Sequence, residues 1–198
     1  NIQEIEELIR NGVDVNIKNS YGATPLYFAA LKNQSNVVEL LIRNGADVNA
    51  KVSQFGDSPL YIASFEGHER VAEILIENGA DVNIRKNSGS APIHGAAQEG
   101  HERIVDLLLK KGTNVNSLNN EGSTPLLMAS YKGQSDVVEL LIRNGADINL
   151  KNIPEESAIY LATLKDHDRV VEILIEKGAD VNIRRKDGFA PIHAAAME

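Results

Sequence analysis

One glycine recurs along the chain at a nearly constant interval, and this repetition constrains the fold more than any other feature of the sequence. Each copy precedes an Asp/Asn-Val/Ile-Asn motif, and successive copies lie 33 or 34 residues apart, at Gly12, Gly45, Gly79, Gly112, Gly145 and Gly178. A proline has the same period, at Pro25, Pro59, Pro92, Pro125 and Pro191, with Ala158 in the one missing place. Two markers with one period indicate a chain of similar structural units rather than a single mixed core.

The unit is predicted to contain two helices, as one well-formed copy illustrates. Thr124 followed by Pro125 places a hydroxyl at the N-cap and proline at the first helical position. Gly133 ends this first helix, since glycine adopts the left-handed conformation at little cost. The second helix contains the run 137–142, which is apolar at i, i+3 and i+4, and Gly145 follows its end. Helices this short are not stable alone in water, so neighbouring units must cover each other.

These strings resemble a known family. GATPLYFAALKNQSNVVELLIRNGADVNA (22–50) and GSTPLLMASYKGQSDVVELLIRNGADIN (122–149) are similar to the ankyrin repeat, with its Thr-Pro-Leu helix start and Gly-Ala-Asp-Val-Asn ending. The resemblance covers essentially the whole chain and implies an all-α solenoid of helix-turn-helix units with hairpin-like fingers. We expect a single ankyrin-repeat domain over 1–198, with full repeats at 19–51, 52–85, 86–118, 119–151 and 152–184, and partial ones at 1–18 and 185–198. Because the pattern starts within a unit and the first residue is not Met, we interpret the chain as a segment of a longer protein.

The sequence also contains a longer repetition that spans several units. VVELLIRNGAD occurs at both 37–47 and 137–147, and the segments 70–85 and 169–184 differ at only two positions. The string Ala-Pro-Ile-His at 91–94 returns at 190–193. We infer that a block of three repeats was duplicated.

Two repeats depart from the pattern. The second full repeat has one extra residue between Asn49 and Gly56, so its finger should be longer than the others. The fifth has Glu155 in place of the turn glycine, Ala158 in place of the proline and Asp166 in place of the inter-helix glycine. Because Asp adopts the left-handed region only at a cost, we expect this repeat to be the least stable internal one.

Two other units lack the hydroxyl at the start of the first helix, where Ala91 and Ala190 stand. Each should lose a cap worth roughly 0.5–2 kcal/mol. Both keep the histidine of the family's helix-start motif, so the usual Thr–His hydrogen bond is expected to be absent from them.

The sequence predicts no catalytic, cofactor-binding or metal-binding residues. Cysteine is absent, which excludes disulfides and thiolate chemistry. The five histidines occupy repeat positions, and units stacked about 10 Å apart keep His68 and His101 from sharing a metal. The asparagines of the recurring motif are interpreted as turn residues that satisfy local backbone groups. An enzyme is therefore the least favoured functional class.

The resemblance implies a protein partner bound on the concave face of the first helices and on the finger tips. Positions free of stacking constraints should carry specificity, and aromatic residues, only 5% of the chain, are typical of binding hot spots. The alternative for Phe65 and Leu164 is that they cover the seam between repeats. The predicted partner-binding residues are Tyr21, Leu31, Lys32, Phe55, Phe65, Gln98, Tyr131, Lys132, Ile153, Leu164 and Phe189, with Met197 at the same helix position in the last unit.

Charge and hydropathy limit the class of partner. The net charge of −8 argues against nucleic acid, and no apolar run approaches the ~18 residues that span a bilayer. Cations recur on the fingers, at Lys18, Lys51, Arg85, Lys151 and Arg184, and anions recur on the second helices, at Glu39, Glu73, Asp106, Glu139 and Glu172. An acidic partner segment at the fingers is one interpretation, and simple solvation of charged faces is the other. We expect a monomer in a cytoplasmic or other intracellular setting, with a structural spacer in a longer array as the alternative function.

Overall fold

The structure is a computed structural model that describes residues 2–196, so Met197 lies outside the described residues. The described chain contains helices that alternate between two positions in the repeating unit. The first helices are α2 (Pro25–Leu31), α4 (Pro59–Phe65), α6 (Pro92–Glu99), α8 (Pro125–Lys132), α10 (Ala158–Leu164) and α12 (Pro191–Ala195). The second helices are α1 (Ile2–Arg10), α3 (Ser35–Arg43), α5 (Glu69–Glu77), α7 (Glu102–Lys110), α9 (Ser135–Arg143) and α11 (Asp168–Glu176).

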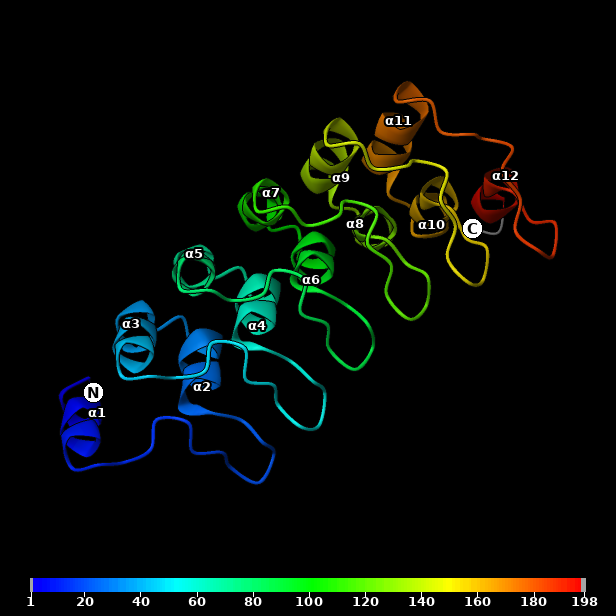
Figure 1. Cartoon of the computed structure of the whole chain (residues 1–198). Coiled ribbons are helices and arrows are strands. Elements are labelled where there is room, and N and C mark those ends of the chain that lie inside the picture. Colours follow the sequence, from blue (N-terminus) through cyan, green and yellow to red (C-terminus); the bar gives the residue numbers. More distant parts are fainter. Residues whose placement is uncertain (1, 197–198) are drawn as a thin grey trace.

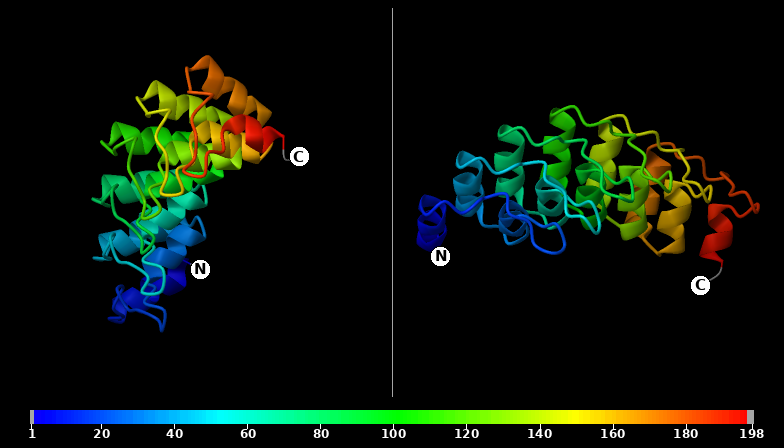
Figure 2. Two further views of the ribbon diagram at one scale, coloured as in Figure 1. Left: turned by 90° about the vertical axis from the view of Figure 1, so that its right-hand side faces the viewer. Right: turned by 60° about the horizontal axis from the view of Figure 1, so that its bottom comes forward.

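The two sets of helices form two layers of a curved stack (Figure 1). The first helices form an inner layer on the inside of the arc, next to the fingers, and the second helices form an outer layer. Each helix packs on the helices before and after it in its own layer and on its partner in the same unit. Figure 2 shows the same elongated stack from two other directions, with the chain termini at opposite ends. The predicted all-α solenoid is confirmed.

The core runs between the two layers through the length of the stack. Leu60, Ile93 and Leu126 of the inner layer are fully buried, as are Leu75 and Leu108 of the outer layer. These side chains recur at one position per unit, so each unit contributes the same few apolar groups to a continuous core.

Helix starts follow the sequence pattern. The side chains of Thr24, Ser58, Thr124 and Ser157 accept a hydrogen bond from the third residue of their helices. Ala91 and Ala190 make no side-chain cap, as expected. In both of these units the backbone N–H of the alanine instead donates to a histidine, at 3.1 Å to Nδ1 of His94 and 3.0 Å to Nδ1 of His193. The histidine thus satisfies the helix start from inside the helix.

The inter-helix turns require left-handed backbone. Gly133 has φ 74°, whereas the corresponding Asp166 has φ 56° and Asn33 has φ 54°. Glu155, which replaces the finger glycine, has φ 63°. Repeat five therefore holds two acidic residues in a conformation that L-residues adopt at a cost.

The fingers are joined from tip to tip. The carbonyls of four tip residues accept a backbone hydrogen bond from the next finger, in the pairs Tyr21–Ser53, Phe55–Asn87, Ser88–Asn120 and Glu121–Ile153, at 2.9–3.0 Å. In the second full repeat the N–H of Gly56 donates to a carbonyl four residues back, whereas the other finger turns close over three. The extra residue therefore lengthens this turn, as the sequence predicted.

The interpretation of the recurring asparagines as purely local turn residues was wrong. The Nδ2 of Asn16 donates to the carbonyl of Gly45 at 2.9 Å, and its Oδ1 accepts from the N–H of Asp47 at 2.7 Å. Asn49 and Asn116 make the same pair of bonds to the following unit. The amide reaches across the interface because each unit places its own loop beside the loop of the next. These side chains therefore fasten units together.

Candidate functional site

A groove of about 260 Å³ lies on the inner face between α8, α10 and the adjoining fingers. Leu127, Met128 and Leu161 supply apolar lining from two successive inner helices. The remaining lining comes from α6, the end of α8 and the fingers, and comprises Gln98, Tyr131, Lys132, Asn119, Glu121, Ser123, Asn152 and Glu156. Three predicted partner-binding residues, Gln98, Tyr131 and Lys132, are thus brought together at one groove.

Tyr131 has a fixed backbone and an exposed ring. Its carbonyl accepts a hydrogen bond from Nε2 of His167 in the next unit, at 3.0 Å. Its side chain is 41% exposed, and the Nζ of Lys165 lies 5.0 Å from the centre of the ring. An aromatic ring held in this way presents apolar area to a ligand at a low cost in conformational entropy.

The predicted finger-tip residues are all exposed. Tyr21, Phe55 and Ile153 expose 62%, 54% and 71% of their area, and Phe189 is also exposed. Tyr21 and Phe55 accept a backbone hydrogen bond from the next finger, and Ile153 donates one to the preceding finger. No such bond joins Phe189 to a neighbouring finger in the described chain. The tips therefore display apolar side chains on an ordered frame, but these lie along the molecule rather than in one cluster.

The other predicted helix residues are more enclosed. Leu31, Phe65 and Leu164 are half-buried, whereas Lys32 is exposed. The ring of Phe65 stacks on Tyr61, with centroids 6.4 Å apart, and lies close to Gly95 of the next inner helix, where an added Cβ would sit 3.4 Å from Phe65. Phe65 thus covers part of the seam between α4 and α6 and keeps one side open.

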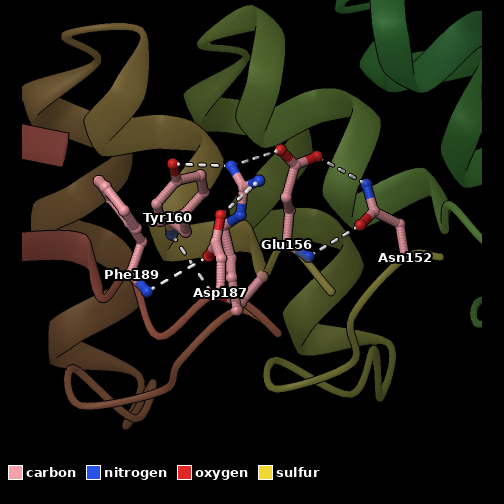
Figure 3. A network of polar contacts seen from close by, with 7 residues as sticks. Asn152, Glu156, Tyr160, Asp187 and Phe189 are labelled. Atoms are coloured by element: carbon pink, nitrogen blue, oxygen red, sulfur yellow. Dashed lines mark hydrogen bonds and ion pairs between the residues drawn. The ribbon is translucent and has the colours of Figure 1, made fainter. Parts of the chain in front are cut away.

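Two polar clusters on this face were missed by the sequence analysis. Figure 3 shows the first, in which Arg185 donates to Tyr160 Oη at 2.9 Å and to Glu156 at 3.3 Å, and also pairs with Asp187 at 3.2 Å. Asn152 in turn donates to Glu156 at 3.0 Å. The guanidinium also lies 5.1 Å from the centre of the Tyr160 ring. The cluster links the last finger to the preceding inner helix.

The second cluster occupies the same positions in the other three-repeat block. The Nζ of Lys86 lies 2.8 Å from a carboxylate oxygen of Asp57 and 4.5 Å from the centre of the Tyr61 ring. Burial raises the pKa of Tyr61, and the charge of Lys86 opposes that rise. Burial is the largest single influence on the pKa of Lys86 and would lower it, but the hydrogen bonds and charges of Asp57 and Tyr61 together raise that pKa above its ordinary value. A cation, a carboxylate and a tyrosine at equivalent places in both blocks were the signal in the sequence that could have revealed these clusters.

The histidines have structural partners. Nε2 of His68 and of His101 contacts the carbonyl of Leu31 and of Phe65 in the preceding unit, at 3.1 and 2.9 Å. His94 is fully buried, with Nδ1 accepting from Ala91 and Nε2 donating to the Ser117 carbonyl at 2.9 Å. Burial lowers its pKa to about 4, so the ring is neutral in the folded protein at pH 7.

Several finger cations are also used within the fold. The Nζ of Lys51 donates to the carbonyl of Arg85 at 2.6 Å, and that of Lys151 donates to the carbonyl of Arg184 at 3.2 Å. Arg85 donates to the carbonyl of Gly89 at 2.7 Å. These recurring cations form hydrogen bonds within a finger or between neighbouring fingers. Fewer cations are therefore available to bind a partner.

Within residues 2–196, no three His, Asp or Glu side chains are grouped so that they could hold a metal ion. Nor is any helix in that range both long enough and apolar enough to cross a membrane.

Comparison with known proteins agrees with this architecture. A family model described as ankyrin repeats (3 copies) matches residues 1–86 and 81–152, and a model described as ankyrin repeat matches residues 155–186. No curated protein matches the chain.

Proposed function

The chain belongs to the ankyrin repeat family, whose repeats generally serve as protein-protein interaction modules, and we propose that it binds a protein partner on its inner face and finger tips. The binding surface would include the groove beside Tyr131 and Lys132, the exposed tips Tyr21, Phe55 and Ile153, and the less exposed positions between them. Members of the family are generally not enzymes, and we assign no reaction to this chain.

One observation supports the proposal most directly. The recurring polar side chains of the repeats form hydrogen bonds with neighbouring units, whereas large apolar side chains on the finger tips are exposed to solvent. The motif asparagines, the inter-helix histidines and several finger cations are engaged by neighbouring units. Tyr21, Phe55 and Ile153 have most of their side-chain area in solvent although they stand on ordered fingers. Exposed aromatic and aliphatic anchors on a rigid surface are typical of binding hot spots.

A capture experiment tests this function. The 198-residue chain would be immobilised, and the proteins retained from a cell extract quantified beside those retained by the variant Tyr21→Ala/Phe55→Ala/Ile153→Ala. We expect the variant to lose a specific partner, with affinity reduced at least tenfold, because hot-spot side chains commonly contribute that much or more.

The matched control is Ile175→Ala/Val181→Ala, which removes two exposed apolar side chains outside the proposed surface. Circular dichroism would verify that both variants fold. If the finger-tip variant retains every protein that the unchanged chain retains, the alternative function of a structural spacer is favoured instead.

A further inference from the structure

Five charged residues stand in line at the ends of the inner helices, one per unit. Lys32, Glu66, Glu99, Lys132 and Lys165 are each the last residue of an inner helix or the residue directly after it. Their charges run positive, negative, negative, positive, positive along the stack. We call these five residues the charge row.

Electrostatic and packing contacts place the charge row on the inner face. The carboxylate of Glu66 contributes to raising the pKa of Tyr27, after the larger effects of burial and of Asp57. Glu99 has a smaller effect of the same sign on Tyr61. Lys132 lines the groove, and Lys165 lies over the ring of Tyr131. Lys132 and Lys165 therefore lie on the same side as Tyr131, and the two glutamates lie within electrostatic range of the tyrosines of the inner helices.

The charge row makes no ion pair with any other described residue, in contrast to the outer layer. There, Glu39 pairs with Arg43 at 3.1 Å and with Arg70 of the next unit at 3.4 Å. Arg103 and Arg169 likewise pair with carboxylates of the preceding unit. Charges of the outer layer thus pair with one another. In the charge row, Glu99 accepts a hydrogen bond from Nε2 of Gln98 at 2.7 Å and Lys165 lies over the ring of Tyr131. Both of these partners are uncharged, so no ion pair within residues 2–196 neutralises the charge row.

The duplicated blocks show that stacking does not fix these charges. Glu66 and Lys165 occupy equivalent positions and have opposite signs, although the flanking segments 70–85 and 169–184 are nearly identical. Lys32 and Lys132, also equivalent, have the same sign. The stacked helices accept either sign of charge at this position. Folding therefore does not determine the order of charges along the row, and binding of a partner can.

We propose that the charge row recognises a partner segment with the opposite order of charges, basic opposite Glu66 and Glu99 and acidic opposite Lys132 and Lys165, with an apolar side chain in the groove beside Tyr131. This inference rests on the proposed protein-binding function and specifies the partner's chemistry. Inner helices lie about 10 Å apart, and a partner in the polyproline II conformation rises about 3.1 Å per residue and returns to the same face every third residue, which gives one contact per three residues of the partner. The two basic side chains and the two acidic ones therefore each lie about three residues apart.

Synthetic peptides test the proposal directly. The probe is a fluorescent peptide with Arg at positions 1 and 4, Glu at positions 7 and 10, and Leu at position 8. Its control has the same composition with the charges alternating, as Arg, Glu, Arg, Glu. We expect the ordered peptide to bind the full chain at least fivefold more tightly in fluorescence anisotropy, and added salt to reduce the difference.

Charge reversal identifies the residues. Lys132→Glu/Lys165→Glu should weaken binding of the ordered peptide about tenfold, and a peptide with its two Glu replaced by Arg should restore binding to this variant. Lys111→Glu/Lys177→Glu is the matched control, because it makes the same change in net charge at the ends of outer helices. It should change the affinity less than twofold.

Equal binding of the ordered and alternating peptides, or equal loss in both double variants, would overturn the inference, as would the absence of binding. These outcomes leave the proposed function standing if the finger-tip variant still loses a captured protein. The two proposals can therefore fail independently.

Discussion

At the scale of single residues, equivalent positions of the two blocks differ in environment. His94 is fully buried and makes two ring hydrogen bonds, whereas His193 is exposed near the end of the described chain. Each of these histidines is the last residue of the same four-residue sequence, Ala-Pro-Ile-His. Burial of a titratable ring therefore depends on whether a further unit covers it.

Stability should depend on the protonation of His94. Burial lowers its pKa from 6.5 to about 4 in the folded chain, so protons bind the unfolded chain more readily. The contribution to the free energy of unfolding is full above pH 6.5 and falls as the pH drops towards 4, by about 3 kcal/mol. Urea titrations at several pH values between 7 and 4 measure this effect. As the pH falls, the free energy of unfolding should decrease more for the unchanged chain than for His94→Gln.

His193→Gln is the control for this measurement, and it should leave the pH dependence as it is in the unchanged chain. Parallel stability curves for the unchanged chain and His94→Gln would show that the buried ring does not govern the acid sensitivity.

At the scale of elements, repeat five lacks the proline and the glycines that define the helix starts and turns of other repeats. It has additional ion pairs on its finger. Its first helix begins without proline, and its turns place Glu155 and Asp166 in left-handed backbone. Lys151 pairs with Glu155 at 2.9 Å, but both side chains are partly exposed, so this pair contributes little. The Arg185 cluster of the next finger supports the repeat from one side.

We expect the amides of α10 and α11 to exchange hydrogen faster than those of α8 and α9 in the native state. Left-handed backbone costs a non-glycine residue roughly 1–2 kcal/mol, less for Asp, and repeat five contains two such residues. Asp166→Gly should slow exchange in α10 and α11. Asn33→Gly in the first repeat should give a smaller gain, because Asn tolerates this region more readily than most residues. Equal protection of α10 and α8 would contradict the ranking.

The elements could be predicted from the sequence because each depends on its own few residues. Thr124, Pro125 and Gly133 set the start and end of α8 by local chemistry, and the structure reproduces them. The groove could not be predicted, since Met128 and Leu161 come from different units and meet only after stacking. The role of Asn16 was missed for the same reason, because a repeating pattern shows which positions recur and not which neighbours they contact.

At the scale of the whole molecule, the main helix contacts within residues 2–196 join each unit to the units directly before and after it, so a local change should have a limited range. Gly67 has φ 76°, and an added Cβ would lie 2.5 Å from the ring of His101. Gly67→Ala should therefore lower the free energy of unfolding by roughly 1–3 kcal/mol and speed hydrogen exchange in α4 to α7, while the exchange rates of α10 and α11 stay as they are in the unchanged chain.

Gly79→Ala separates the two causes, because Gly79 has a similar φ of 88° but no atom within 4 Å of the added Cβ. The difference in free energy of unfolding between Gly67→Ala and Gly79→Ala gives the energetic cost of displacing the His101 side chain. Equal loss of protection along the entire molecule would mean that the stack unfolds as one unit.

The tip-to-tip bonds of the fingers have a mechanical consequence. At three junctions, those between α3 and α5, α5 and α7, and α9 and α11, short backbone bonds between finger tips hold the inner edge and longer, solvated arginine–glutamate pairs hold the outer edge. Tension applied to the two ends would strain the junctions in series and open the compliant outer edge before the stiff inner one. The molecule should then behave as a shallow elastic arc that changes curvature under load while the spacing of its finger tips is nearly constant.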